Sequence, residues 1–182
     1  MMTTEENLPI LLQDPDQRRN AFSSMVAMYS EKLYWQIRRM VLSHDDANDV
    51  LQNVFMKAWS SIENFRGDSK LSTWLYKIAI NESLTFLSKI NNHPTSSLDG
   101  EAELMANRLE SDTFTDGDAI EIKLQKAILT LPEKQRLVFQ LRYYDEMKYE
   151  EMSELLTTSV GALKASYHHA AKKIGEYLTA ED

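Results

Sequence analysis

The sequence predicts an all-α protein made of two small helical domains joined by a flexible acidic linker, the second containing a helix-turn-helix. Apolar residues recur at helical spacing along most of the chain, and few segments alternate apolar and polar residues as strands do. Only five glycines and four prolines interrupt the 182 residues. A hydrophobic content of 43% and a charged content of 26% are typical of a chain that folds. This length is enough for two domains near the lower end of the usual size range.

Residues 1–15 are predicted to form an N-terminal tail. A signal peptide would carry positive charge followed by an apolar run, whereas this segment carries Glu5, Glu6 and Asp14. No stretch approaches the roughly 20 apolar residues that a membrane-spanning helix needs. The absence of cysteine excludes disulfides and thiol nucleophiles, and it fits a reducing compartment. We therefore expect a cytoplasmic protein that would meet a membrane only through a partner.

Residues 16–92 are predicted to form the first domain, which begins with two amphipathic segments. Apolar residues from Asp16 to Leu42 fit one long helix or two helices broken near Ser30. Asp45 or Asp46 can then cap a further helix. The apolar residues of that helix keep the spacing i, i+3, i+4, i+7 and are Ala47, Val50, Leu51, Val54, Phe55, Ala58, Trp59 and Ile62.

A last helix completes the first domain. The run from Phe65 to Ser69 places a glycine among polar residues and interrupts the helical pattern. Ser72 or Thr73 can cap the helix that follows. Its apolar residues are Trp74, Leu75, Ile78, Ala79, Leu84 and Leu87.

Residues 93–118 are predicted to form the linker. The segment opens on Pro94, Thr95 and two serines, and a short helix within residues 102–109 is compatible with its pattern. A single Arg108 stands against seven carboxylates, which are Asp99, Glu101, Glu103, Glu110, Asp112, Asp116 and Asp118.

Residues 119–182 are predicted to form the second domain, which ends in a helix-turn-helix. Helical spacing resumes at Ala119, and Pro132 can start a helix at its first turn. A short helix is expected from Tyr149 to Leu156, followed by a turn at Thr157 and Thr158. Ser159 then caps a final helix that runs to about Leu178. Two helices joined by so short a turn are typical of a DNA-binding motif.

The final helix is expected to pack one face inside the domain and to present the other to DNA. Its apolar stripe consists of Val160, Leu163, Tyr167, Ala170 or Ala171, and Ile174. The opposite face carries lysines and histidines, and no carboxylate occurs between Ser159 and Glu176. Because the whole chain has a net charge of −8, such a surface is a local positive site where a recognition helix would enter a major groove. Lysines that complement a helix dipole without any ligand are the simpler alternative.

Two sets of motifs, in order and separated by the linker, resemble those of the extracytoplasmic-function group of sigma-70 family sigma factors, over about Phe22 to Tyr177. In the first domain they are Asp46–Phe55, Ala58–Trp59, Phe65–Asp68, Ser72–Ala79 and Asn81. In the second domain they are Leu131–Arg136, Val138–Phe139, Leu141–Tyr143, Tyr149–Met152 and Ser159–Lys164.

The resemblance implies a non-enzymatic protein that binds core RNA polymerase and directs promoter-specific transcription initiation, with no cofactor or metal and with an inhibitory anti-sigma factor as a further partner, which can be membrane-bound. The residues implied in polymerase binding are Asp46, Asp49, Gln52 and Asn53. Those implied at minus-10 DNA, where a flipped base needs stacking and edge hydrogen bonds, are Phe65, Arg66, Gly67, Asp68, Ser69, Lys70, Asn81 and Lys89. Those implied at minus-35 DNA are Ala162, Lys164, Ala165, Ser166, His168, His169 and Lys172. The acidic linker resembles the segment that the family threads through polymerase.

The sequence also departs from the family pattern. Only Lys89 stands where the family has a cluster of arginines after Asn81, so fewer phosphate contacts are expected at minus-10 DNA. Alanines and histidines replace the arginines of the usual recognition helix, so the family's sequence preference does not transfer to this chain. Ser153 and Thr157 replace a common alanine and a common turn glycine.

Three alternatives stay open at this stage. A helical adaptor would bind protein partners without DNA, and a DNA-binding regulator would never enter polymerase. An enzyme has little support, because the sequence has no glycine-rich phosphate loop, no nucleophile elbow and no cysteine. His44 beside Asp45, Asp46 and Asp49 suggests a metal site, but carboxylates near a helix start are common for electrostatic reasons alone.

Overall fold

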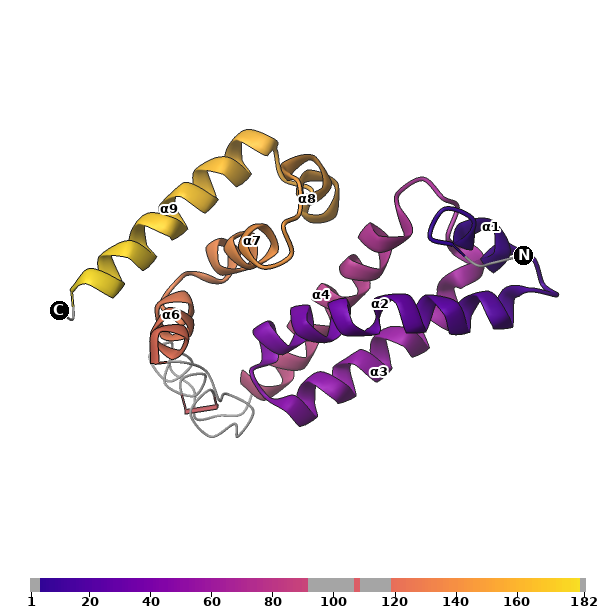
Figure 1. The fold of residues 1–182 in the computed structure, drawn as a ribbon, viewed down its shortest axis with the longest axis horizontal. Helices are drawn as coiled ribbons and strands as arrows, with labels where there is room; N and C mark the ends of the chain where they lie inside the picture. The colour runs from indigo at the N-terminus through magenta and orange to yellow at the C-terminus, as the bar shows by residue number, and fades with distance from the viewer. Residues whose placement is uncertain (1–3, 92–106, 109–118, 181–182) are drawn as a thin grey trace. The chain divides into compact units, whose positions relative to one another are not determined.

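A computed structural model describes residues 4–91, 107–108 and 119–180, and these residues form helices and connecting loops without a strand. The chain divides into two compact units (Figure 1). The first holds α1, α2, most of α3 and α4 as far as Phe86, and the second holds Leu42–His44, the end of α4 and α6 to α9. The predicted all-α class is confirmed. Of the predicted linker, residues 93–118, only residues 107 and 108 are described, and both are helical. None of the described helices is long and apolar enough to cross a membrane.

The predicted N-terminal tail is wrong, because it contains a docked helix. Helix α1 spans Leu8–Gln13 and carries Pro9 in its first turn, where a missing N–H costs nothing. Leu8 and Leu12 lie one turn apart and are fully buried. Burial of these two leucines holds the segment in the first unit, where a tail without apolar periodicity would have stayed in solvent.

Helix α2 spans Arg18–Val41 without a break, which decides between one helix and two. The hydroxyl of Ser30 donates to the carbonyl oxygen of Val26 one turn earlier, so this serine continues the helix and does not end it. The helix ends at Leu42, whose φ of 66° is in the left-handed region that terminates helices.

Helix α3 spans His44–Ser61, and the 3-10 helix η1 follows at Ile62–Asn64. Asp45 and Asp46 lie inside the first turn of α3, where their charge interacts favourably with the helix dipole, so neither is the predicted cap. The buried residues of α3 are Ala47, Val50, Val54 and Ala58.

Helix α4 spans Leu71–Asn91, so Ser72 and Thr73 also lie within the first turn and not at the predicted cap. Between η1 and α4 the chain turns through Gly67, which has a φ of 77° that glycine adopts without steric cost. Lys57 of α3 forms an ion pair with Glu82 of α4, which joins the two helices at the surface.

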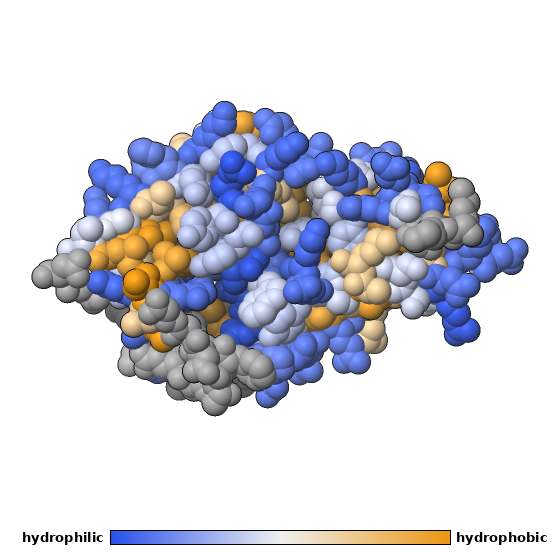
Figure 2. Space-filling model, viewed as in Figure 1, coloured by the Kyte–Doolittle hydropathy of each residue, from blue (hydrophilic) through white to orange (hydrophobic). Residues whose placement is uncertain are grey.

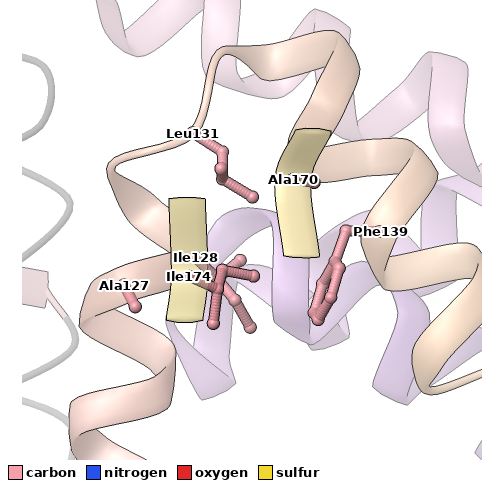
Figure 3. Packing of buried hydrophobic residues seen from close by; sticks show 6 residues of the cluster. All are labelled: Ala127, Ile128, Leu131, Phe139, Ala170 and Ile174. Carbon is pink, nitrogen blue, oxygen red and sulfur yellow. The ribbon is translucent and has the colours of Figure 1, made fainter. Parts of the chain in front are cut away.

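The second unit consists of α6 at Ala119–Leu129, α7 at Glu133–Tyr143, α8 at Tyr149–Leu156 and α9 at Val160–Thr179. Pro132 is the N-cap of α7, one residue before its predicted place. The core cluster consists of Ala127, Ile128, Leu131, Phe139, Ala170 and Ile174. Figure 3 shows Ile128 and Ile174 close together, with Phe139 and Leu131 directed into the same interior. Helix α9 thus shares one core with α6 and α7.

Hydrophilic residues cover much of the visible surface, with smaller hydrophobic patches between them (Figure 2). The most exposed large apolar side chains in the described residues are Ile10, Ile120, Met56, Trp35, Tyr143, Trp59 and Met28. Single exposed apolar residues are normal on protein surfaces, so exposure alone does not mark a binding site.

Candidate nucleic-acid interface

The turn before α9 fixes the start of the candidate recognition helix. Thr157 adopts a left-handed conformation with φ 52° and ψ 45°, and the N–H of Thr158 donates to the carbonyl oxygen of Ser153 at 3.3 Å. The hydroxyl of Ser159 then accepts a hydrogen bond from the N–H of Ala162 at 3.3 Å, as a helix N-cap does. This confirms the predicted cap, and it shows that Thr157 fills the turn position of a glycine.

Helix α9 buries the predicted apolar stripe. Leu163, Ala170 and Ile174 are buried, and Ala170 takes the place that the sequence left open between Ala170 and Ala171. Tyr167 is half-buried and stacks on Phe139 of α7 with ring centroids 5.5 Å apart and an interplanar angle of 12°. The stacked rings fix the rotation of α9 about its own axis, and this determines which residues face outward.

The outward side of α9 carries the residues expected at minus-35 DNA, and we call it the α9 face. Its exposed members are Ala162, Lys164, Ala165, His168, His169 and Lys172, with Ser166 half-buried. Lys172 and Lys173 make weak surface contacts, since Lys172 lies 3.9 Å from Glu176 and Lys173 donates to Gln135 at 3.2 Å. No carboxylate lies between residues 160 and 175, so the face stays electropositive along about four turns.

The ring of Tyr149 carries two cations, Lys164 and Arg142, and the sequence assigned no role to Tyr149 or Arg142. The Lys164 ammonium lies 5.7 Å from the centroid of the Tyr149 ring, and the Arg142 guanidinium lies 5.2 Å from it. Arg142 is held in turn by donating to the carbonyl oxygen of Met147 at 3.1 Å. Both residues fall in quoted motifs, but the contacts of Arg142 and Lys164 with the Tyr149 ring join α7, α8 and α9, and no local pattern reveals them.

The residues expected to bind polymerase share the outer side of α3. Asp49, Gln52 and Asn53 are exposed and Asp46 is half-buried, opposite the buried residues of that helix. Met56 lies one turn beyond Gln52 and is 64% exposed. Trp59 was expected in the apolar stripe but is 45% exposed. Its ring packs on that of Phe22 in a T-shaped arrangement, with the two ring centroids 4.9 Å apart. The polar side of α3 therefore ends in an apolar patch that the sequence analysis missed.

Residues 65–70 form a loop, which we call the 65–70 loop. Its middle is exposed to solvent and its first residue is buried. Arg66, Gly67, Asp68 and Lys70 are exposed, and Ser69 is half-buried. Phe65 is only 6% exposed and packs on Trp74 with ring centroids 5.1 Å apart. The structure thus places Phe65 as a core aromatic, and its ring does not offer an open face for a base.

Helix α4 carries the remaining residues expected at minus-10 DNA. Asn81 and Lys89 are exposed, about 15 Å and about 27 Å from Leu71 along the helix axis. The 65–70 loop and these two side chains would therefore contact separate stretches of a bound strand. Lys77 is exposed one turn before Asn81 and adds a basic group that the sequence analysis quoted but did not assign.

The described residues contain no group of three or more histidine, aspartate or glutamate side chains that could hold a metal ion. His44 and its neighbouring aspartates therefore do not form a metal site of that kind. What the described residues do present is two polar helix faces and one exposed loop.

Comparisons with known proteins agree with this arrangement. The family model for Sigma-70 region 2 matches residues 25–92, and the model for Sigma-70, region 4 matches residues 121–174. The chain is 32% identical over 170 residues to the ECF RNA polymerase sigma factor SigW of Bacillus subtilis, which covers 88% of this chain and 90% of SigW.

Two solved structures have the same fold. CnrH in complex with the cytosolic domain of CnrY gives a TM-score of 0.70 at 20% identity and covers 98% of this chain and 99% of that one. The sigma factor RpoE of Bartonella quintana, in complex with the anti-sigma factor NepR, gives 0.66 at 21% identity and covers 88% and 98%. From the two matched regions and the identity to SigW, the chain belongs to the extracytoplasmic-function group of the sigma-70 family of RNA polymerase sigma factors.

Proposed function

We propose that this sigma factor binds core polymerase through the outer side of α3, holds minus-10 DNA with the 65–70 loop and α4, and lays the α9 face on minus-35 DNA. Residues 16–92 and 119–182 would be the two working domains, with α1 added to the first, and residues 93–118 would be the tether. The protein would act in the cytoplasm, where polymerase is.

The observation that carries this proposal is the α9 face. Six of its residues are exposed on a helix capped by Ser159 and fixed by aromatic stacking, in a chain with a net charge of −8. The net negative charge of the whole chain repels DNA, so the attraction has to come from a local positive face. The N-terminal end of α9 adds the partial positive charge of a helix dipole beside small residues, which lets the backbone approach phosphates closely.

Promoter-directed transcription with purified core polymerase tests the proposal. Core polymerase plus this chain is expected to start transcripts at defined sites, which sequencing of the transcript starts identifies. A protein-binding adaptor would give no such starts, and a regulator that never enters polymerase could not replace the missing initiation factor. Absence of association with core polymerase, with any inhibitor removed, would falsify the proposal.

We also propose an inhibitory anti-sigma factor as a partner. The matched RpoE structure contains such a factor, NepR, and the CnrH structure contains the cytosolic domain of CnrY. The exposed Met56 and Trp59 beside the polar side of α3 would suit an apolar partner surface that competes with polymerase. Co-purification from the source cell, followed by competition against core polymerase, is the measurement; a partner that leaves polymerase binding unchanged contradicts inhibition by this route.

A further inference from the structure

We propose that helix α1 positions the 65–70 loop through the side chain of Gln13, which makes Gln13 a positioning residue for promoter opening. The inference rests on the proposed function, because it concerns the loop assigned there to minus-10 DNA. It adds to that function a segment, residues 4–18, most of which the sequence predicted to be an N-terminal tail.

The Gln13 side chain joins both ends of η1. Its amide nitrogen Nε2 donates to the carbonyl oxygen of Ile62 at 3.0 Å and to that of Phe65 at 2.9 Å. Phe65 is the C-cap of η1 and the last residue before the exposed Arg66. One side-chain amide therefore uses both of its N–H groups on the backbone from which the loop departs.

Helix α1 is held in place by buried side chains and by hydrogen bonds, so it can fix the position of the backbone that Gln13 contacts. Leu8 and Leu12 are fully buried, and the Arg18 Nε donates to the carbonyl oxygen of Leu12 at 3.0 Å. The same guanidinium pairs with Glu63 of η1 at 2.6 Å. Arg18 and Gln13 thus hold η1 from two neighbouring points.

A further contact ties the beginning of the segment to α2. The hydroxyl of Tyr29 donates to the Glu5 carboxylate at 2.8 Å. Burial is the larger cause, and this hydrogen bond the smaller one, of a pKa of Tyr29 that is raised above its usual range. The phenol therefore remains a donor at neutral pH. Contacts thus extend along the segment from Glu5 to Arg18, and within it the Gln13 side chain reaches the backbone of Phe65, the first residue of the loop.

The position of the 65–70 loop depends on the contacts at its two ends. At its far end the carbonyl oxygen of Lys70 accepts from the N–H of Trp74 at 3.1 Å, and the Phe65 ring packs on that same tryptophan. Between the ends lies Gly67 with its left-handed φ of 77°, and a Cβ added there would meet nothing within 4 Å. Because the middle has open space around it, the anchors decide where Arg66 and Asp68 point, and a base pocket needs that geometry set in advance.

The test uses full-length holoenzyme carrying Gln13→Met, which keeps the length of the side chain and removes both donors. The matched control is Gln17→Met, since Gln17 is exposed and bonds only locally to Asp14. Opening of the minus-10 element is followed by fluorescence of 2-aminopurine placed in the non-template strand. We expect opening to fall on the order of tenfold for Gln13→Met and to stay unchanged for Gln17→Met.

Two further measurements separate positioning from simple loss of structure. Affinity for core polymerase and binding of upstream minus-35 duplex should match the wild type, and Gln13→Arg, which restores donors, should recover part of the opening. An equal loss in core affinity, or opening as fast as the wild type, overturns the role of Gln13. Failure of the wild-type holoenzyme to initiate would instead overturn the proposed function, so the two failures are distinct.

Discussion

The α9 face and the 65–70 loop achieve exposure by different structural means. The α9 face stands on a helix whose other side is packed into a core, so its side chains are presented by rigid backbone. The 65–70 loop is held at its ends, by Gln13 and by the start of α4, and its middle carries a glycine with positive φ. A regular helix matches the regular groove of duplex DNA, whereas an extruded base needs a local pocket. The difference predicts that the two regions respond oppositely to the same kinds of substitution.

Removing the core beneath the α9 face should have the largest effect. Phe139 is 4% exposed and stacks on both Tyr143 and Tyr167. Phe139→Ala should cost about 3–5 kcal/mol of unfolding free energy, because it leaves a cavity and removes the stacking that orients α9. Denaturant unfolding measures the cost. Binding to minus-35 duplex should be lost while binding to core polymerase persists; loss of both would mean that the two units do not fold independently.

Removing one charge from the intact α9 face should have the next largest effect. Lys164→Ala should weaken minus-35 binding by about 1–3 kcal/mol if the ammonium reads a base, and should lower the salt slope by about 1 if it contacts a phosphate. Titrations at several salt concentrations distinguish the two roles. Lys134→Ala, another exposed lysine at the start of α7, is the control. Equal affinity of Lys164→Ala and wild type at every salt concentration would remove Lys164 from the interface.

The same substitution at two glycines should have opposite signs in the two regions. Gly67→Ala should cost about 1–2 kcal/mol, because an added Cβ meets nothing within 4 Å and the penalty comes from the left-handed backbone alone. Gly175→Ala in α9 also meets nothing within 4 Å but should stabilise by about 0.5–1 kcal/mol, because glycine is a poor helix residue. Unfolding free energies of both variants provide the check. A neutral Gly67→Ala would show that the loop relaxes to an ordinary conformation.

Local patterns predicted most of the helices, while the structure was needed for what joins them. The helical spacing that placed Leu163, Ile174 and either Ala170 or Ala171 on one stripe is a property of neighbouring residues, and the structure buries Leu163, Ala170 and Ile174. Ser159 was also predictable as a cap, because a serine directly before a helical apolar pattern is a local signal. By contrast, α1 is shorter than two turns, and a six-residue amphipathic pattern predicts little without its partner surface.

The candidate site shows the same limit. The exposed side of α9 followed from its spacing, and most of its predicted residues are exposed. Phe65 lay in a quoted motif, but its burial against Trp74 depends on a contact between a loop and a helix. Trp59 was expected in the apolar stripe of its helix but is 45% exposed, whereas Met56 lay outside that stripe and Lys77 is charged, so the exposure of these two agrees with the local pattern. Roles in binding, for all these residues, remain predictions until the variants are measured.

The smallest expected effect concerns how the α9 face holds its lysine. The Lys164 ammonium and the Arg142 guanidinium both lie over the Tyr149 ring, 5.7 Å and 5.2 Å from its centroid, and an exposed cation–π contact contributes about 0.5–1 kcal/mol. Tyr149→Leu should therefore weaken minus-35 binding several-fold, whereas Tyr149→Phe keeps the ring and should bind like the wild type. Lys164→Ala combined with Tyr149→Leu should then cost little more than Lys164→Ala alone. Full additivity in that double-mutant cycle would mean that Tyr149 acts on DNA directly and not through the lysine.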